Sequence, residues 1–177
     1  MSTLLHICCA PCSITCIEDL RSEGIEPIGY WNNPNIHPFT EWRMRRNTLV
    51  DYAKSISLDL VQDGEYGLRT FLAATAQEPD QRCPYCYQSR LEPTAKYAAE
   101  HGFEAFTTTL LVSPYQNHEL LVQVGREMGE KYGVTFLPRD FRPRFREGQA
   151  KARELELYMQ KYCGCIFSEE DRYRKKK

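Results

Sequence analysis

A chain of 177 residues, with a hydrophobic fraction of 42% and a charged fraction of 27%, has the size and composition of one folded domain, residues 1–177. A formal net charge of -1 argues against nonspecific binding to polyanions, and the longest apolar runs are far too short to span a membrane. Because residues 1–10 also lack the basic and apolar stretches of a secretory signal, we expect a cytoplasmic protein with no membrane partner.

The first part of the chain alternates short apolar runs with segments of helical periodicity. Pro11 opens a segment with Ile14, Ile17 and Leu20 at helical spacing, and Gly24 ends it. In chain order, this part predicts a strand over 3–7, a helix over 11–24, a strand over 26–31, a turn-rich segment over 32–38, a helix over 39–55 and a strand over 58–61.

The second part continues the alternation. It predicts helices over 67–75 and 86–101, a strand over 105–112, a helix over 117–131, a strand over 134–137 and a last helix over 147–162. Since parallel strands need crossover connections, we expect an α/β fold, a Rossmann-like (HUP-like) parallel sheet with helices on both faces. Such sheets bind ligands at the carboxyl ends of their strands, so we expect a metal site there, directly after residue 7.

Eight cysteines in a reducing compartment indicate metal binding or redox chemistry, because stable disulfides are rare there. Seven of them form three groups far apart in the chain: Cys8, Cys9 and Cys12; Cys83 and Cys86; Cys163 and Cys165. The first two groups fall at predicted helix starts, where backbone amides favour thiolates. The last pair encloses one residue and could chelate a metal or form a strained, readily reduced disulfide.

Three interpretations of these groups remain open on spacing alone. Two Cys-x-x-Cys knuckles could hold a zinc ion in a nucleic-acid-binding module, which would use only four sulfurs. Cys9 and Cys12 could be the redox pair of a thioredoxin-like thiol–disulfide oxidoreductase, which would leave the other groups idle. An iron–sulfur cluster with additional redox thiols or a second metal would employ seven of the cysteines, with Cys16 left as a small buried hydrophobic residue.

Five motifs, in order along nearly the whole chain, resemble those of the epoxyqueuosine reductase QueH family. They are LHICCAPC at 5–12, NPNIHP at 33–38, RCPYCY with RL at 82–91, FTTTL with SPY at 106–115, and YCGC with a serine at 162–168. The resemblance implies a cobalamin-independent oxidoreductase. It would convert the epoxide of epoxyqueuosine at the tRNA wobble position into the cyclopentene of queuosine.

The resemblance also implies metal ligands and redox residues. A 4Fe-4S cluster would be held by Cys8, Cys9, Cys83 and Cys86. Cys163 and Cys165 match the family's proposed redox-active pair. For an additional mononuclear iron beside the cluster, and for catalysis, we expect Cys12, Cys163, Cys165 and Asp140.

Removing an epoxide oxygen to leave an alkene takes two electrons and two protons, whereas a 4Fe-4S cluster passes one electron at a time. The dithiol of Cys163 and Cys165 could supply both electrons, or a ferrous ion could bind the oxygen as a Lewis acid and share the electron load. Both routes stay open, as does the identity of the electron donor. The general acid for the departing oxygen could be His37, Tyr115 or Asp140.

Polar residues of the recognisable loops are candidates for contacts with the anticodon stem-loop of the tRNA. They are Asn33, Asn35, His37, Thr107, Thr108, Thr109, Tyr115, Arg142 and Arg144. Aromatic and guanidinium groups alternate over 139–153 and suit splayed bases and phosphates. We expect the basic C-terminal part, 139–177, to carry Cys163 and Cys165 into the site and to end in a charged tail over 172–177.

Plain structural roles are the alternatives for these residues. Rigid turn geometry could account for 33–38, β-propensity for the three threonines at 107–109, and a solvated helix face for the arginines of 139–153. His6 is expected to be a hydrogen-bonded core histidine.

Overall fold

The computed structural model describes residues 1–174, so residues 175–177 of the predicted charged tail lie outside the described residues. At its centre is a parallel sheet in the order β3-β2-β1-β4-β5. The strands are β1 (Thr3–His6), β2 (Ile28–Trp31), β3 (Leu60–Gln62), β4 (Ala105–Thr108) and β5 (Thr135–Phe136). Because β1 pairs with both β2 and β4, the segment that follows β1 emerges at the middle of the carboxyl edge of the sheet.

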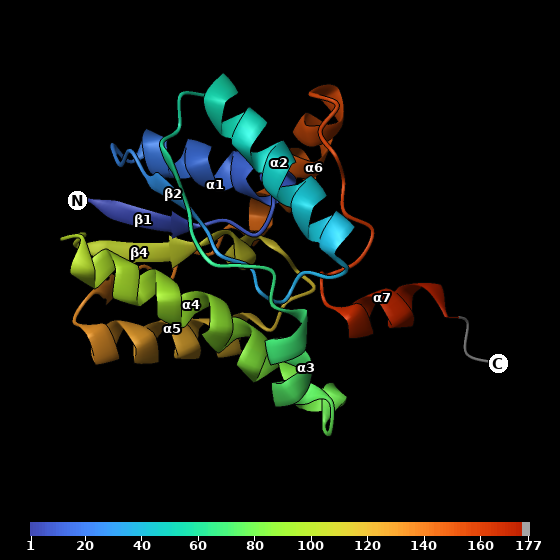
Figure 1. Ribbon diagram of the computed structural model, residues 1–177. Coiled ribbons are helices and arrows are strands. Elements are labelled where there is room, and N and C mark those ends of the chain that lie inside the picture. Colours follow the sequence, from blue (N-terminus) through green and yellow to red (C-terminus); the bar gives the residue numbers. More distant parts are fainter. Residues whose placement is uncertain (175–177) are drawn as a thin grey trace.

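Helices cover both faces of this sheet, which confirms the predicted α/β architecture (Figure 1). They are α1 (Ala10–Ser22), α2 (Phe39–Ser55), α3 (Leu68–Thr75), α4 (Arg82–Glu100), α5 (His118–Tyr132), α6 (Phe145–Glu154) and α7 (Ile166–Tyr173). Helices α1, α2 and α6 lie on one face, and α4 and α5 lie on the other (Figure 1). Over residues 1–174, the structure contains no helix of the length and apolar character that crossing a membrane requires.

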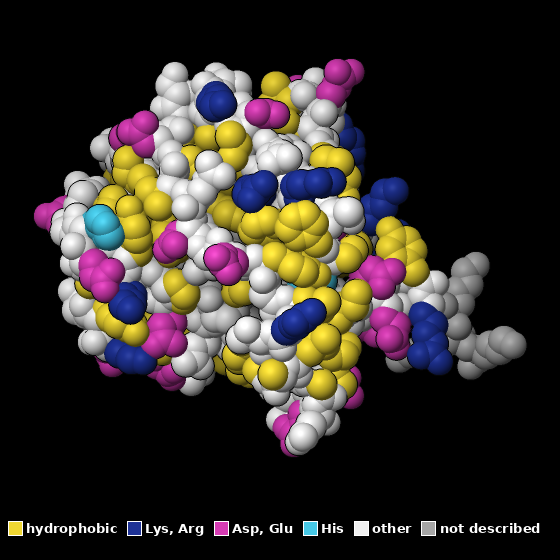
Figure 2. Space-filling model, in the orientation of Figure 1, with side chains coloured by type: hydrophobic (Ala, Val, Ile, Leu, Met, Phe, Trp, Pro, Cys, Tyr) yellow, Lys and Arg dark blue, Asp and Glu magenta, His cyan; other side chains and the backbone are white. Residues whose placement is uncertain are grey.

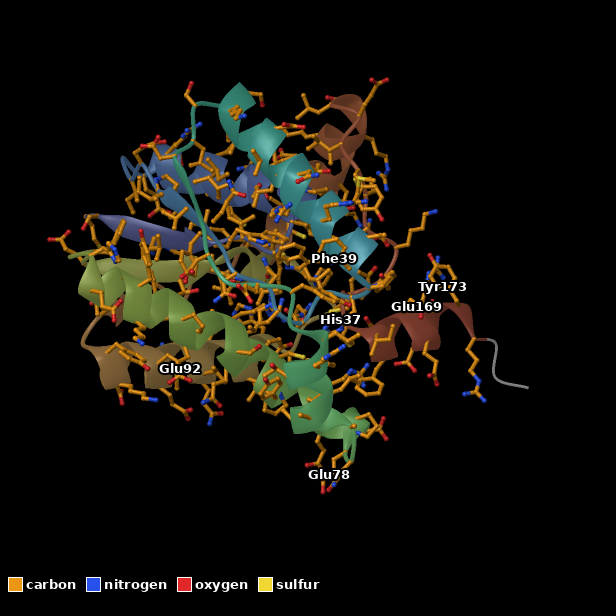
Figure 3. The ribbon with its side chains drawn as sticks, in the orientation of Figure 1. His37, Phe39, Glu78, Glu92, Glu169 and Tyr173 are labelled. Atoms are coloured by element: carbon orange, nitrogen blue, oxygen red, sulfur yellow. The ribbon has the colours of Figure 1, made fainter. Side chains whose placement is uncertain are left out.

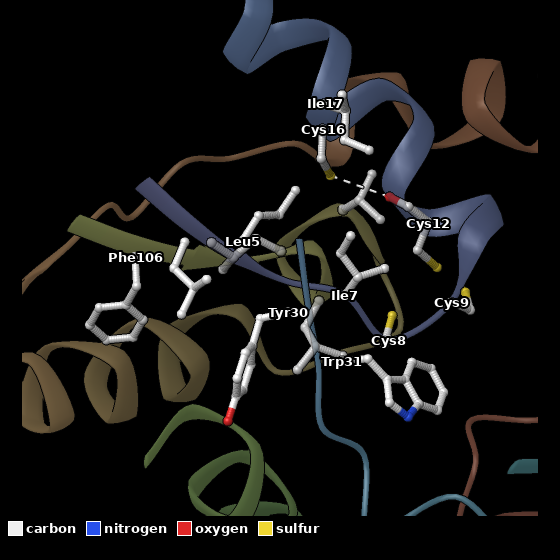
Figure 4. Packing of buried hydrophobic residues seen from close by; sticks show 14 of the residues in the cluster. Leu5, Ile7, Cys8, Cys9, Cys12, Cys16, Ile17, Tyr30, Trp31 and Phe106 are labelled. Atoms are coloured by element: carbon white, nitrogen blue, oxygen red, sulfur yellow. Dashed lines mark hydrogen bonds between the residues drawn. The ribbon is translucent and has the colours of Figure 1, made fainter. Parts of the chain in front are cut away.

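The core around β1 is formed by large apolar side chains (Figure 4), because helices cover both faces of this central strand and bury all of its residues. It includes Leu5, Ile7, Ile17, Tyr30, Trp31 and Phe106. Cys16 lies in the same core with no exposed surface, and its thiol donates a hydrogen bond to the carbonyl of Cys12 over 3.3 Å. The expectation of a small buried residue at position 16 is therefore confirmed.

The predicted strand over 105–112 is half wrong, because β4 ends at Thr108 and a 3-10 helix, η2 (Thr109–Val112), follows. The Thr108 hydroxyl accepts the backbone N–H of Leu110 over 3.2 Å and so caps the new helix. This turn diverts the chain at the carboxyl edge of the sheet and aims Thr109 at the segment that follows β1.

The predicted last helix over 147–162 is also wrong in its extent, since α6 ends at Glu154 and a further helix, α7, follows. Glu156 has a φ of 56°, and the Leu157 N–H returns to the Ala152 carbonyl over 3.0 Å, a closing bond that ends the helix. Residues 155–165, which we call the strap, therefore run in extended and turn conformation between α6 and α7 (Figure 1).

His6 is the expected core histidine, with no exposed surface. Its Nδ1 pairs with the Thr108 hydroxyl over 2.9 Å, and its Nε2 lies 3.1 Å from Oδ1 of Asn33 and 3.2 Å from the carbonyl of Asn32. Burial, followed by the positive charge of Arg90, lowers the pKa of His6 to about 4. Burial likewise lowers the pKa of His37 to about 4.

These two histidines predict a loss of stability in mild acid. Above pH 6.5 the folded and unfolded chains are both neutral at these positions; as the pH falls toward 4, only the unfolded chain gains the protons. The free energy of unfolding should therefore fall between these values by up to about 3 kcal/mol per histidine. Urea denaturation of the reduced chain across this range measures the slope.

The control separates histidines from carboxylates. His6→Gln should reduce the slope between pH 6.5 and 5 by about half, because His37 still contributes, whereas His101→Gln, at a surface histidine, should keep it. Equal slopes in the two variants would contradict the assignment.

Candidate active site

The three cysteines of the first group converge directly after β1. Cys9 is the N-cap of α1, with an extended backbone, and Pro11 lies in the first turn, where the helix needs no N–H from it. The sulfurs of Cys8, Cys9 and Cys12 all lie within 4.8 Å of one another, and all three side chains are buried. Figure 4 shows the three sulfurs grouped at the start of the helix, on the side away from Cys16.

The three thiols differ in the direction in which their pKa values are shifted: that of Cys8 is lowered, and those of Cys9 and Cys12 are raised. Hydrogen bonds from Cys12, then Cys9, and a smaller effect of the hydrogen bond with Thr109 hold the pKa of the Cys8 thiol well below its usual range, although burial raises it. The Thr109 hydroxyl lies 3.3 Å from the Cys8 sulfur and also accepts the Cys8 N–H over 3.1 Å. The pKa of the Cys12 thiol is raised, because this thiol donates a hydrogen bond to the Cys8 sulfur and is buried. Full deprotonation of this group requires a bound cation, as in a metal site.

The second and third cysteine groups meet each other apart from the first group, and none of Cys83, Cys86 and Cys165 lines the pocket that holds the sulfurs of the first group. Cys83 and Cys86 lie in the first two turns of α4, and Cys86 packs with Cys165 and Phe71 in a small apolar cluster. Burial raises the pKa of the Cys86 thiol to about 12, against the effect of the Arg90 guanidinium. Arg90 donates from Nε to the Cys86 carbonyl over 3.1 Å and is 2% exposed.

Helix α2 binds the strap and so positions Cys163 near the first cysteine group, Cys8, Cys9 and Cys12. Arg45, which is 2% exposed, donates to the carbonyls of Cys163 and Tyr162 over 3.0 and 2.9 Å, while its Nε binds Glu41 over 2.8 Å. On the other side, the His37 N–H donates to the Gly164 carbonyl over 2.8 Å. Because each nitrogen of this buried guanidinium donates a hydrogen bond, Arg45 fixes the strap against α2.

His37 also binds the start of α7, near which Figure 3 shows it. Its Nδ1 accepts the Ile166 N–H over 3.0 Å, so its Nε2 carries the proton and donates to the Pro34 carbonyl over 3.1 Å. Both ring nitrogens are used in positioning the chain, which leaves no proton for a substrate.

One pocket of about 820 Å³ joins the first cysteine group to Cys163 of the strap. Cys8, Cys9, Cys12 and Cys163 all line it, and the Cys163 sulfur accepts a hydrogen bond from Gln116 over 3.4 Å. Its described lining holds five cationic side chains and no carboxylate: Arg90, Arg146, Arg153, Lys161 and Arg172. None of these five forms an ion pair within residues 1–174. The pocket therefore combines thiols with an uncompensated positive wall.

Two of the expected substrate residues line this pocket, Thr109 and Tyr115. Tyr115 is 86% exposed at the rim and meets Phe145 edge to face. Three of the other polar residues hold the scaffold through hydrogen bonds: Asn33 donates to the Ile7 carbonyl, Thr107 donates to the Leu137 carbonyl, and Thr108 pairs with His6. Asn35 is 2% exposed, and its Oδ1 is buried without a hydrogen-bond partner within residues 1–174.

Asp140, Arg142 and Arg144 are not brought to the pocket. Asp140 pairs with Arg142 through two oxygens, and these hydrogen bonds lower the pKa of the carboxyl to about 2, so the group is ionised and has no proton to give at neutral pH. Arg144 is neutralised by Glu18, Asp19 and Glu147 where α6 packs on α1. The basic stretch is thus used partly for internal ion pairs.

Sequence reasoning missed several pocket residues. Arg90 follows Cys83 and Cys86 at helical spacing on α4, so its position on the same helix face was readable. Gln116, which lines the pocket, and Arg45, which holds the strap from α2, carried no such signal, since their contacts form only in the folded chain.

A protein-family model described as "Epoxyqueuosine reductase QueH" matches residues 3–171. Curated relatives with this name include proteins from Dehalococcoides mccartyi, 35% identical over 97% of this chain and 94% of the relative, and from Thermotoga maritima, 37% identical over 94% and 90%. A third, from Haemophilus influenzae, is 33% identical over 95% of this chain and 71% of the relative.

Two solved structures share the fold at low sequence identity. One is a predicted subunit of a tRNA methyltransferase from Methanocaldococcus jannaschii, with a TM-score of 0.57 and 11% identity over 86% of this chain and 76% of that chain. The other is the U34-tRNA thiolase NcsA from Methanococcus maripaludis with its [4Fe-4S] cluster, with a TM-score of 0.61 and 13% identity over 95% and 61%. These likenesses support the HUP-like architecture.

Proposed function

Because the chain belongs to the epoxyqueuosine reductase QueH family, we propose that it reduces epoxyqueuosine to queuosine at the wobble position of tRNA. One observation of the structure carries this proposal beyond the family name: thiols from positions 8–12 and 163 line one pocket whose other charged groups are all cationic. Such a pocket suits a redox reaction on a polyanionic substrate. We place the reaction in the cytoplasm, within a single domain of residues 1–177.

The donor set fits an iron–sulfur cofactor. Three buried sulfurs within 4.8 Å of one another at a helix start are a soft, preorganised thiolate site. We propose that Cys8 and Cys9, together with Cys83 and Cys86, hold a 4Fe-4S cluster, which supplies electrons one at a time when bound. Cys12 and Cys163, which line the same pocket, are our candidates for ligands of an additional mononuclear iron.

The residues of the chain can balance the reaction. If Cys163 and Cys165 close to a disulfide, they give up two electrons and two protons. The epoxide then loses both of its C–O bonds, the oxygen leaves as water with the two protons, and the ring carbons form the alkene. An external donor must return two electrons for each turnover. Tyr115 is the one of the three proposed general acids that lines the pocket.

The pocket wall suits the RNA. Five cations without acidic partners among the described residues would attract the phosphates around the wobble nucleotide, and Tyr115 at the rim offers a ring on which a splayed base could stack. The membrane is not expected as a partner.

The test combines metal analysis with turnover. Chain purified without oxygen should be brown, contain several irons and acid-labile sulfide, and convert epoxyqueuosine in the anticodon stem-loop to queuosine when a low-potential chemical reductant is supplied. Queuosine is measured by mass spectrometry of the digested RNA. A colourless protein that holds zinc and leaves the epoxide intact would favour the zinc-stabilised nucleic-acid-binding module. Disulfide exchange without epoxide reduction would favour the thioredoxin-like oxidoreductase.

A further inference from the structure

Aromatic and arginine side chains form a stripe along the first half of α2, which runs from the buried ring of Trp42, 6% exposed, to the exposed Phe39 and Arg43. Phe39, Trp42, Arg43 and Arg46 recur at the i, i+3, i+4 and i+7 positions that share one helix face. We call these four residues, with Tyr66 beside them, the α2 patch. Figure 2 shows Lys and Arg side chains next to a hydrophobic area over the end of α2 that Figure 3 marks with Phe39.

The rings and guanidinium groups of the α2 patch are stacked in layers. The rings of Phe39 and Trp42 lie 5.7 Å apart at 29°, and Tyr66 meets Phe39 edge to face at 5.5 Å. Arg46 lies over Trp42 at 4.6 Å, and Arg43 lies over Phe39 at 5.7 Å. Phe39 is nonetheless 47% exposed, so the outermost layer has an open face.

The charges of the α2 patch are unused. Other arginines of the chain are in ion pairs, such as Arg21 with Glu26 and Arg139 with Glu23. Within residues 1–174, neither Arg43 nor Arg46 pairs with a carboxylate, although Glu41 lies on the same helix. Glu41 binds Arg45 and Tyr158 instead. Two positive charges beside an open aromatic face are complementary to an anion that carries a flat ring.

The α2 patch adjoins the wall of the pocket. Arg45, between Arg43 and Arg46 in the chain, points inward and holds the carbonyls of Tyr162 and Cys163, both of which line the pocket. The same helix therefore faces the strap with one side and solvent with the other. The α2 patch and the pocket are thus linked through Arg45 and the strap.

We propose that the α2 patch binds an unpaired stretch of the tRNA next to the wobble nucleotide, with one base on Phe39 and phosphates on Arg43 and Arg46. This inference rests on the proposed function, because it takes the tRNA as the substrate. Base–aromatic stacking and arginine contacts with phosphate are the two interactions by which proteins hold single-stranded RNA. The absence of acidic partners for Arg43 and Arg46 within residues 1–174 favours a polyanion over an apolar peptide.

The experiment measures binding of an anticodon stem-loop that carries epoxyqueuosine, as a function of salt. Arg43→Ala/Arg46→Ala should weaken binding by roughly tenfold at low salt and reduce the slope of log K against log salt by about 1.4, since each contact with single strands contributes about 0.7. Phe39→Ala should weaken binding by roughly tenfold with little change in slope. For both, the loss in turnover should fall on KM and not on kcat.

Two further variants make the result specific. Lys96→Ala/Arg126→Ala removes the same charge from exposed positions of α4 and α5, which likewise form no ion pair within residues 1–174, and should change Kd by less than about twofold. Arg43→Lys/Arg46→Lys keeps the charge but not the planar group, and should keep the salt slope while losing affinity. Iron content at the wild-type level shows that each variant is folded.

Equal weakening in the α2 and control pairs would reduce the effect to net charge and overturn the inference, as would unchanged binding in the α2 pair. Neither result would change the turnover of the wild-type chain, so neither would contradict the proposed function. A wild-type chain that neither binds nor reduces the stem-loop would instead refute the proposed function, and the α2 patch with it.

Discussion

Cys9→Ser protein, purified without oxygen, is expected to contain little iron and to reduce epoxyqueuosine at less than about one hundredth of the wild-type rate. Even the outer-shell partners of metal ligands are worth about 10- to 100-fold in activity or metal affinity, and the loss of a ligand should exceed that. Cys9 caps α1 and its sulfur lies with those of Cys8 and Cys12, so serine preserves the helix start and removes only the soft donor. Iron, sulfide and visible absorbance report the cluster, and queuosine formation reports the activity.

Cys16→Ala is the matched control for this result. Cys16 lies on the same helix with no exposed surface, and its thiol bonds only to the Cys12 carbonyl. Its loss should cost some stability through a small cavity and leave iron content at the wild-type level. Equal iron in Cys9→Ser and wild type would contradict the cluster assignment.

Cys83→Ser extends the test to the distant segment. Cys83 lies in the first turn of α4, 74 positions after Cys9, so loss of iron in this variant would show that sulfurs remote in the chain hold one cofactor. Wild-type iron content would restrict the metal site to residues 8–12.

The fold was predictable where local signals agree with the tertiary structure. The helix over 39–55 has the predicted bounds, and its buried residues Trp42, Leu49, Tyr52 and Ala53 recur at helical spacing. The break after Thr108 was not predictable from β-propensity, since it depends on a hydroxyl shared between His6 and the Leu110 N–H. The end of α6 depends on the left-handed backbone conformation of Glu156, which a glutamate in the sequence does not predict.

The candidate site divides in the same way. The cysteines were identified by spacing at helix starts, a local signal that needs no knowledge of the fold. The cationic wall was identified only in part: the stretch 139–153 supplies Arg146 and Arg153 to the pocket, whereas Arg144 joins ion pairs with α1. Which arginines of a basic segment face a ligand depends on how the helix packs against the rest of the fold. The spacing of the charges in the sequence does not predict that packing.

Cys165→Ser protein is expected to keep its iron, and its turnover rate should fall by at least about 1,000-fold. In well-studied enzymes, removing one member of a catalytic unit lowers kcat by about 10⁴- to 10⁶-fold. The Cys165 sulfur accepts the Ser168 N–H over 3.4 Å and caps α7, a role that serine also fills. Only the capacity to form a disulfide with Cys163 is then lost. The measurement is kcat on the stem-loop, alongside iron content.

A single-turnover reaction without reductant sharpens this prediction. Wild-type chain should yield one queuosine per dithiol, and peptide mapping should find Cys163 joined to Cys165, whereas the serine variant should yield neither. If the variant instead turned over at the wild-type rate, both electrons would have to pass through metal ions at the pocket. A ferrous ion that polarises the epoxide oxygen would then replace the dithiol as the explanation, and Cys163 would act as its ligand.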